Sequence, residues 1–386
     1  MHNGSGQANR FSSLAACALA AVVFCSCASA DVAIVKQGKP LAKIVLGHKA
    51  TGVEKHAAVE LQKYIKQISG AALEIAGEDA AGAKGTFVLI GTPESSKLVS
   101  RLSDGLDIKS VKYDGFVIKE VAHGGASYLV LASPEARGCL YAVYDLLESA
   151  LGVGFFWAGD RVPQAADVSI TAAAQKVSSP YFEYREYLQG CAVQYSWVTY
   201  WDFRQWKKEI DWAAKHKFNI LWYPSAGMLI EKRVYKRLGV DLGATTDGDR
   251  READFIRQII NYARALGMKV VGPGFTGSVK AELKKVYPDA KYIEIQWLDL
   301  PPRLNLYPTD PLFKQLGQYL IEEYTREYGT DHLYDVGAYD ETSPGKTRQE
   351  KQAIKVHFAK AVCEYIRTAD PEGIWHMSGW TFQDPQ

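Results

Sequence analysis

The second half of the chain alternates strand-like and helical patterns, and this alternation most constrains the fold. Short apolar runs of strand type lie at residues 181–188, 219–223, 269–272, 333–338 and 374–379. Helical patterns such as residues 201–216 and 253–266 separate them, with apolar side chains recurring at helical spacing. Strands separated by helices of this length predict parallel βαβ units. A (β/α)8 TIM barrel is favoured over an open sheet, because the candidate active-site loops all follow strands.

The number of strands is too small for a closed barrel. A closed barrel needs eight strands and typically about 250 residues, whereas we count five strand segments before Gln386. We therefore expect residues 181–386 to form a partial TIM-barrel catalytic domain with about five strands.

The preceding part of the chain has a different organisation. Residues 42–46, 86–90, 116–121 and 128–131 have strand patterns, and residues 53–68 have a helical one. A second helix is expected between Ser133-Pro134 and Gly152. These patterns predict a small α/β domain over residues 31–163. A run rich in Ala, Gln and Ser then predicts a linker over residues 164–180.

The first thirty residues are typical of a signal peptide. Arg10 supplies the positive end, residues 14–24 the apolar stretch, and residues 28–30 a small-residue cleavage site. We expect export to the periplasm or the exterior. Lipidation at Cys27 stays open as the weaker alternative, because the residues before it poorly match a lipoprotein cleavage box. No later segment is apolar for the roughly 20 residues that a transmembrane helix needs.

Composition narrows the functional classes. The 45 basic and 44 acidic side chains nearly cancel without a basic stripe, which argues against nucleic acid as a partner. The histidines are scattered without zinc-ligand spacing, so we expect neither a metal nor another cofactor. The 22 Tyr and 9 Trp suit sugar faces, although core packing explains most aromatic residues in any protein.

One stretch carries the catalytic hypothesis. Residues 329–341 combine a strand-like run with two adjacent carboxylates, Asp340 and Glu341, before a Thr-Ser-Pro-Gly loop. A carboxylate at the C-terminal end of a barrel strand faces the active site. The alternative is that the pair only caps the next helix or is solvated.

Several motifs, in order, resemble the α-N-acetylglucosaminidases of glycoside hydrolase family 89. They are Tyr195-Ser196 and residues 201–212 (WDFRQWKKEIDW), 233–235 (RVY), 275–279 (FTGSV), 287–288 (YP), 329–334 (GTDHLY) and 379–382 (GWTF). Residues 137–148, 155–157 and 159–163 resemble the accessory α/β domain that precedes the barrel in several glycoside hydrolase families.

The resemblance implies a retaining mechanism with carboxylates after the fourth and seventh barrel strands. It assigns the general acid/base to Glu341 and implies a nucleophile well beyond Trp380, outside this chain. We therefore expect the chain alone to be inactive. The adjacent Asp340 would help to raise the pKa of the acid, although the family has a neutral residue there.

The resemblance also implies substrate contacts from Gln189, Cys191, Tyr195, Asp340 and Trp380, with core packing as the alternative for the aromatic residues. Four positions depart from the family pattern. The family has Asn at Gln189, a neutral residue at Asp340, Glu at Met228 and usually His at Ser278. These departures fit a member with a different terminal α-sugar or one that has lost activity.

We interpret the sequence as an exo-acting retaining glycoside hydrolase that removes terminal α-linked N-acetylglucosamine from glycans. One alternative is a related exo-glycosidase of the hexosaminidase or α-glucuronidase type. The other is a non-catalytic carbohydrate-binding protein that keeps the aromatic residues Tyr195, Trp201 and Trp380. The oligomeric state does not follow from the sequence.

Overall fold

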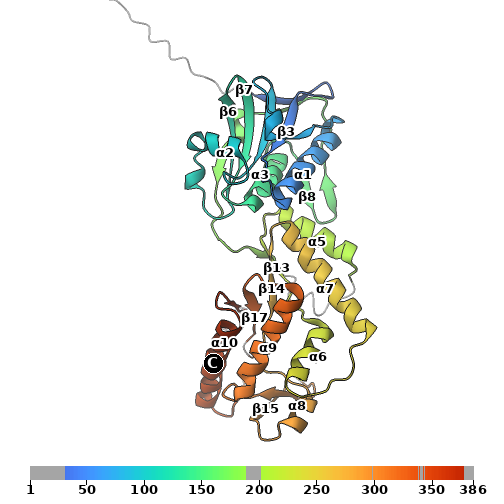
Figure 1. The fold of residues 1–386 in the computed structure, drawn as a ribbon, viewed down its shortest axis with the longest axis vertical. Coiled ribbons are helices and arrows are strands. Elements are labelled where there is room, and N and C mark those ends of the chain that lie inside the picture. The colour runs from blue at the N-terminus through green and yellow to red at the C-terminus, as the bar shows by residue number, and fades with distance from the viewer. Residues whose placement is uncertain are drawn as a thin grey trace, which may run out of the picture.

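The computed structural model describes residues 31–187, 201–297, 299–337, 339, 342 and 344–377. Two domains are stacked along the long axis of the molecule, with the N-terminal α/β domain at one end and the barrel-type domain at the other (Figure 1). Among the described residues, no helix has the length and apolar character needed to cross a bilayer.

The N-terminal domain is built on a mixed six-stranded sheet with strand order β11-β6-β7-β5-β3-β4. Its strands are β3 (Ala42–Leu46), β4 (Ile75–Gly77), β5 (Thr86–Gly91), β6 (Phe116–His123), β7 (Ala126–Ala132) and β11 (Lys176–Ser178). Helices α1 (Gly52–Ser69) and α3 (Ala136–Ser149) pack in one hydrophobic cluster with one face of the sheet, and α2 (Lys97–Leu102) packs with the other. The predicted strands and helices of this region are confirmed.

Helix α1 shows how local sequence sets the element boundaries. At its start, the Thr51 backbone N–H donates to the Glu54 carboxylate at 2.6 Å, and the Glu54 N–H donates to the Thr51 hydroxyl at 3.3 Å. This reciprocal pair satisfies backbone donors that the first turn would otherwise leave unpaired. At its end, Gly70 adopts a left-handed conformation with φ 78°, which glycine takes without steric cost.

Smaller elements complete the domain. β1 (Val32–Lys36) pairs with β10 (Val168–Ile170) and β2 (Lys39–Pro40), and β8 (Gly154–Phe156) pairs with β9 (Gly159–Arg161). The strands β10 and β11 lie within residues 164–180, the predicted linker. This segment therefore adds one strand to the three-stranded sheet and one to the six-stranded sheet of the N-terminal domain before the chain enters the barrel-type domain.

The second domain contains a curled sheet of parallel strands in the order β12-β13-β14-β17-β18. The strands are β12 (Glu186–Tyr187), β13 (Ile220–Trp222), β14 (Lys269–Pro273), β17 (Leu333–Asp335) and β18 (Ile374–His376). These five are the strands that the sequence predicts, and the half-barrel confirms the prediction of an incomplete TIM barrel. The helices are α5 (Phe203–Lys215), α6 (Gly227–Arg237), α7 (Asp247–Ala265), α8 (Ala281–Val286), α9 (Pro311–Tyr328) and α10 (Arg348–Ala369).

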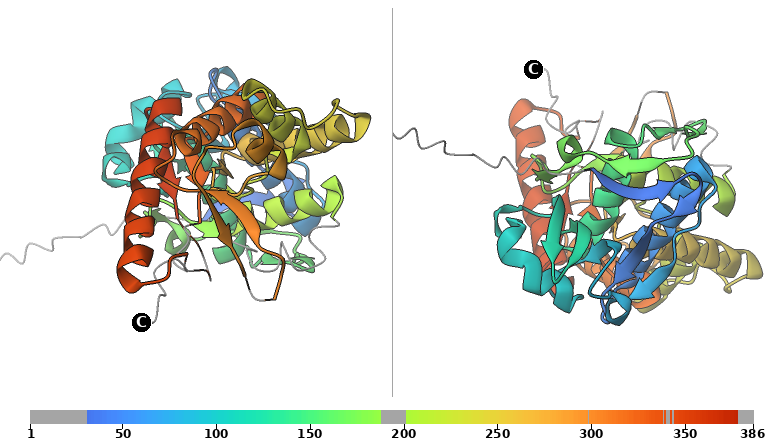
Figure 2. Two further views of the ribbon diagram at one scale, coloured as in Figure 1. Left: turned by 90° about the horizontal axis from the view of Figure 1, so that it is seen from below. Right: turned by 90° about the horizontal axis from the view of Figure 1, so that it is seen from above.

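The two faces of this sheet pack differently. Helices lie around its outer face (Figure 2), where Val270 and Tyr334 belong to the large hydrophobic core. Ile220, Val271 and Leu333 form a separate apolar cluster on the inner face. Between α8 and α9 an antiparallel hairpin, β15 (Tyr292–Ile295) and β16 (Arg303–Leu306), extends the loop after β14. The sequence patterns did not predict this hairpin.

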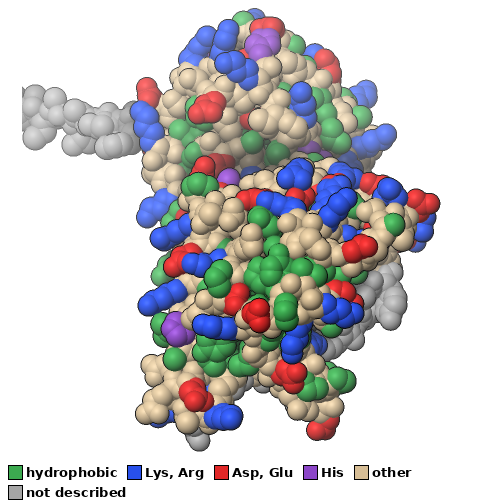
Figure 3. Space-filling view, turned by 60° about the horizontal axis from the view of Figure 1, so that its bottom comes forward, with side chains coloured by type: hydrophobic (Ala, Val, Ile, Leu, Met, Phe, Trp, Pro, Cys, Tyr) green, Lys and Arg blue, Asp and Glu red, His purple; other side chains and the backbone are tan. Residues whose placement is uncertain are grey.

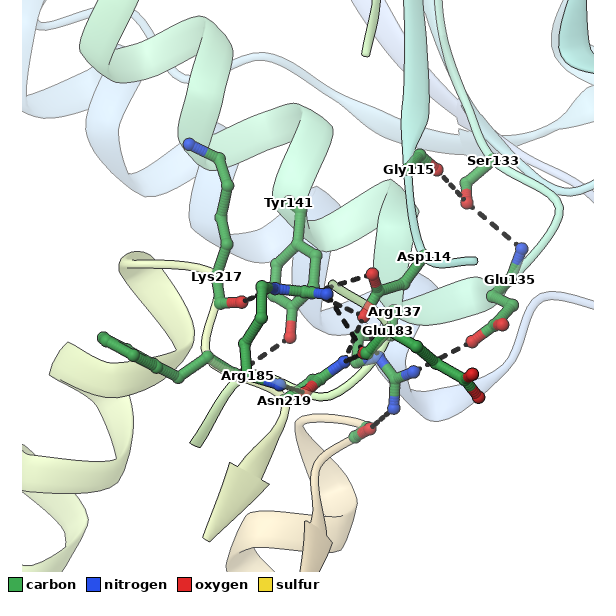
Figure 4. A network of polar contacts seen from close by, with 12 residues as sticks. Asp114, Gly115, Ser133, Glu135, Arg137, Tyr141, Glu183, Arg185, Lys217 and Asn219 are labelled. Atoms are coloured by element: carbon green, nitrogen blue, oxygen red, sulfur yellow. Dashed lines mark hydrogen bonds and ion pairs between the residues drawn. The ribbon is translucent and has the colours of Figure 1, made fainter. Parts of the chain in front are cut away.

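A buried carboxylate joins the two domains (Figure 4). Asp114, whose side chain is fully buried, accepts hydrogen bonds from Arg137 Nε at 2.8 Å, Arg185 Nη2 at 2.7 Å and Asn219 Nδ2 at 2.8 Å. Arg137 also donates to the Gly267 carbonyl oxygen at 2.6 Å. A buried charge is tolerated only when it is paired in this way.

The position of this network shows which ends of the barrel strands the N-terminal domain covers. Arg185 and Asn219 immediately precede β12 and β13, so the N-terminal domain covers the N-terminal ends of these strands. The C-terminal ends of the strands lie on the other side, where TIM-barrel enzymes place their active sites.

Candidate active site at the C-terminal ends of the strands

Three ionisable side chains converge on the inner face of the curled sheet. His376 on β18 lies between two carboxylates, with Nε2 at 2.8 Å from Glu186 Oε2 and Nδ1 at 2.9 Å from Asp335 Oδ1. Glu186 belongs to β12 and Asp335 to β17. Strands from three separate parts of the sequence therefore build one cluster, which we call the Glu-His-Asp cluster.

The cluster has an unusual electrostatic state. Burial disfavours the charged imidazolium, but the hydrogen bonds to Asp335 and Glu186 outweigh burial and raise the pKa of His376 to about 9. The imidazole is therefore protonated at neutral pH and donates from both nitrogens. The side chains of Glu186, Asp335 and His376 keep 17%, 21% and 24% of their surface exposed, so solvent reaches the cluster.

Apolar side chains adjoin the cluster on the inner face. Asp335 lies two residues beyond Leu333 on β17, and alternate residues of a strand share a face. Half-buried Trp222, at the C-terminal end of β13, packs against the inner cluster of Ile220, Val271 and Leu333. An aromatic side chain and hydrogen-bonding carboxylates on one concave face suit a sugar, which has apolar C–H faces and polar edges.

Tyr339, which follows β17 in the chain, is buried and has a strained backbone conformation. Tyr339 has a φ of 56°, which is uncommon for a non-glycine residue, and its ring packs on Phe358 of α10 with centroids 4.9 Å apart. Its hydroxyl is buried without a hydrogen-bond partner among the described residues. Residues held in such conformations cluster at active sites, and Tyr339 immediately precedes the predicted pair Asp340 and Glu341.

Tyr365 of α10 also contacts the backbone of the loop after β14. The Tyr365 hydroxyl accepts a hydrogen bond from the Phe275 N–H at 3.0 Å and lies 3.0 Å from the Phe275 carbonyl oxygen. At the start of α6, the helix that follows β13, the Met228 N–H donates to the Glu252 carboxylate of α7 at 2.8 Å. Ser278, another of the four departures from the family pattern, is exposed and forms an isolated bridge with Asn305.

The residues predicted for the site, Glu341, Asp340, Gln189, Cys191, Tyr195 and Trp380, all lie outside the described residues. Their roles stay predictions. Trp201, named for the carbohydrate-binding alternative, is described and is buried. It stacks on Trp157 and meets Trp206 edge-on, so it packs in the core instead of offering a face to a sugar.

Sequence reasoning did not single out Glu186, Asp335 or His376. The only sequence signal is that Asp335 and His376 are polar residues inside otherwise apolar strand patterns, and Glu186 has no such signal because its segment also holds Glu183 and Arg185. Among the described residues, no group of three or more His, Cys, Asp and Glu side chains has an arrangement that could hold a metal ion.

Two family models match separate parts of the chain. The α-N-acetylglucosaminidase TIM-barrel domain matches residues 246–386, and the glycosyl hydrolase family 67 N-terminus matches residues 31–146. Human α-N-acetylglucosaminidase is 25% identical over 291 residues, which cover 67% of this chain and 38% of the human protein. The chain thus spans less than half the length of that relative.

Solved structures have the same fold. A family 89 glycoside hydrolase from Clostridium perfringens, in complex with PUGNAc, has a TM-score of 0.61 and 13% identity, and the match covers 86% of this chain and 38% of that chain. A family GH115 4-O-methyl-α-glucuronidase has a TM-score of 0.53 and 16% identity, covering 88% and 41%. In sequence, residues 246–386 are therefore similar to the α-N-acetylglucosaminidase barrel and residues 31–146 to the family 67 N-terminus, and the chain shares its fold with a family 89 glycoside hydrolase.

Proposed function

We propose that this chain is part of an exo-acting, retaining glycoside hydrolase that removes terminal α-linked N-acetylglucosamine, with Glu341 as the general acid/base. The main support is the match of residues 246–386 to the α-N-acetylglucosaminidase barrel. A Clostridium perfringens family 89 enzyme of the same fold is known in complex with its substrate GlcNAc-α-1,4-galactose. Glu341 follows β17, the fourth strand of the curled sheet.

The chemistry of this role follows from general principles. The acid must be protonated when it meets the glycosidic oxygen, and it must be ionised when it later activates water. A retaining enzyme also needs a nucleophilic carboxylate about 5 to 5.5 Å from the acid. We propose that this nucleophile lies in a part of the protein outside residues 1–386. The signal-like sequence of residues 1–30 supports export as the setting of the activity.

A panel of aryl glycosides on the full-length protein tests the substrate. The proposal predicts hydrolysis of an aryl α-N-acetylglucosaminide in preference to the α-glucoside, the β-N-acetylglucosaminide and the α-glucuronide. Proton NMR of the first product should show the α-anomer, because two displacements at the anomeric carbon retain its configuration. A β-anomer as first product would contradict the retaining mechanism.

An α-glucuronidase activity is the second candidate. Its support is the likeness of the fold to the GH115 4-O-methyl-α-glucuronidase and the family 67 match of the N-terminal domain. Preference for the aryl α-glucuronide in the same panel would favour this candidate. Sugar binding without turnover of any panel member would favour a carbohydrate-binding protein.

A further inference from the structure

The Glu-His-Asp cluster has acceptor capacity left over after its internal hydrogen bonds. His376 occupies Glu186 Oε2 and Asp335 Oδ1. The other carboxylate oxygens, Glu186 Oε1 and Asp335 Oδ2, receive no hydrogen bond from a described residue. An ionised carboxylate only accepts hydrogen bonds. The cluster can therefore accept further donors, such as sugar hydroxyl groups, on a face that solvent reaches.

The cluster also has a net negative charge. Two carboxylates face one imidazolium, which leaves one negative charge in excess. In the described part of the chain, neither carboxylate forms an ion pair with Lys or Arg. An anionic group that approached these oxygens would meet like charge with incomplete compensation, at partly buried side chains whose field is screened less than in bulk water.

Trp222 supplies an independent reason to place a sugar here. It projects to the inner face at the C-terminal end of β13, the neighbour of β12 in the sheet. Glu186 pairs with Ile220, and Trp222 lies two residues beyond Ile220, on the same face and nearer the open end. An aromatic ring on the same face of the sheet as carboxylate oxygens offers both of the contacts that a neutral sugar uses.

We propose that the Glu-His-Asp cluster is a specificity-determining site that accepts hydroxyl groups of a neutral sugar and rejects sugars carrying sulfate or carboxylate. The proposal rests on the proposed function, because it assigns the charge class of the substrate to the same face of the barrel. Specificity of this kind arises from an unfavourable interaction with the wrong ligand as much as from contacts with the right one.

Ligand binding by the full-length protein tests the charge discrimination without requiring turnover. The dissociation constants of N-acetylglucosamine and of its 3-O- and 6-O-sulfates would be measured by calorimetry. We expect at least one sulfate to bind at least tenfold more weakly than the neutral sugar. Glu186→Gln and Asp335→Asn, which each remove one charge at constant shape, should each reduce that ratio at least threefold.

Glu364→Gln is the matched control, because Glu364 forms an exposed ion pair with Lys314 on the outer face of the domain. This variant should keep the wild-type ratio. Equal binding of neutral and sulfated sugars by the wild type, or no binding of either, overturns the inference even if a variant fails to fold. Ratios that stay within twofold of wild type in both cluster variants also overturn it.

The outcomes separate the two proposals. Hydrolysis of the aryl α-N-acetylglucosaminide without charge discrimination would support the proposed hydrolase activity and overturn the specificity role of the cluster. Charge discrimination without hydrolysis would support the specificity role of the cluster in sugar binding and overturn the proposed hydrolase activity.

Discussion

Glu186 Oε2 lies 2.8 Å from His376 Nε2, although the two residues belong to β12 and β18, the opposite edges of the five-stranded sheet. The contact requires the sheet to curl until its first and last strands face each other. Asp335 holds the second imidazole nitrogen from β17. The inner face of the half-barrel is therefore fixed by a charged cluster in addition to its apolar side chains.

This cluster predicts that stability depends on the protonation of His376. Its pKa is raised to about 9 in the folded protein, above the unfolded value of about 6.5. Its contribution is therefore fully present below pH 6.5 and is lost as the pH rises through 9. We expect His376→Gln to cost on the order of 2 kcal/mol at pH 6 and much less at pH 9.5.

Urea unfolding of the full-length wild type and variant at both pH values measures this difference. His123→Gln is the control, because His123 is exposed at the end of β6. It should change stability little at either pH. An equal cost of His376→Gln at pH 6 and pH 9.5 would contradict the ionic role of His376.

The buried Asp114 network between the two domains predicts that substitution of Asp114 strongly lowers the free energy of unfolding. Asp114→Asn removes the negative charge that Arg137 and Arg185 share in a buried place. Breaking a buried ion pair leaves uncompensated charge, so we expect a loss of about 3 to 5 kcal/mol in the free energy of unfolding. Denaturant titration monitored by far-UV circular dichroism gives this value.

Asp104→Asn provides the comparison for this experiment. Asp104 forms an ion pair with Lys109 in which both side chains are almost fully exposed, so the change should cost less than about 1 kcal/mol. Similar losses for the two variants would show that the Asp114 network does not stabilise the domain contact.

Two substitutions at Tyr339 separate the contribution of its aromatic ring to stability from that of its hydroxyl group. Its hydroxyl has no hydrogen-bond partner among the described residues, whereas its ring packs on Phe358. Tyr339→Phe should therefore change the free energy of unfolding by less than about 1 kcal/mol. Tyr339→Ala should cost about 3 to 5 kcal/mol, as other aromatic truncations in cores do.

The activities of the same two variants test the link between Tyr339 and the proposed acid/base Glu341. Tyr339→Ala should also lower kcat, because the contact of its ring with Phe358 anchors the residue that immediately precedes Asp340 and Glu341 in the chain. A Tyr339→Ala enzyme with unchanged kcat at a temperature where it is folded would show that this loop needs no such support.

The sequence predicted elements better than it predicted their contacts. The apolar runs at residues 219–223 and 269–272 became β13 and β14, because a buried parallel strand needs a continuous apolar stretch. The hairpin β15–β16 was missed, because its strands alternate too weakly to stand out. The Glu-His-Asp cluster was missed for a different reason.

The meeting of Glu186 with His376 depends on strand register and on the curl of the whole sheet. Neither can be seen in a single segment of sequence. Motifs that lie next to each other along the chain, such as Asp340-Glu341, were accessible to sequence reasoning. Side chains that meet only across the barrel interior required the fold.

Substitution of Glu341 tests the proposed hydrolase mechanism most directly. The measurement is kcat/KM of the full-length protein and its Glu341→Gln variant with an aryl α-N-acetylglucosaminide, alongside the Kd of each for N-acetylglucosamine. We predict that the variant loses about 10²- to 10⁴-fold in kcat/KM, the range of general acid/base catalysis, while its Kd changes little. A variant that hydrolyses the substrate as fast as the wild type would contradict the account.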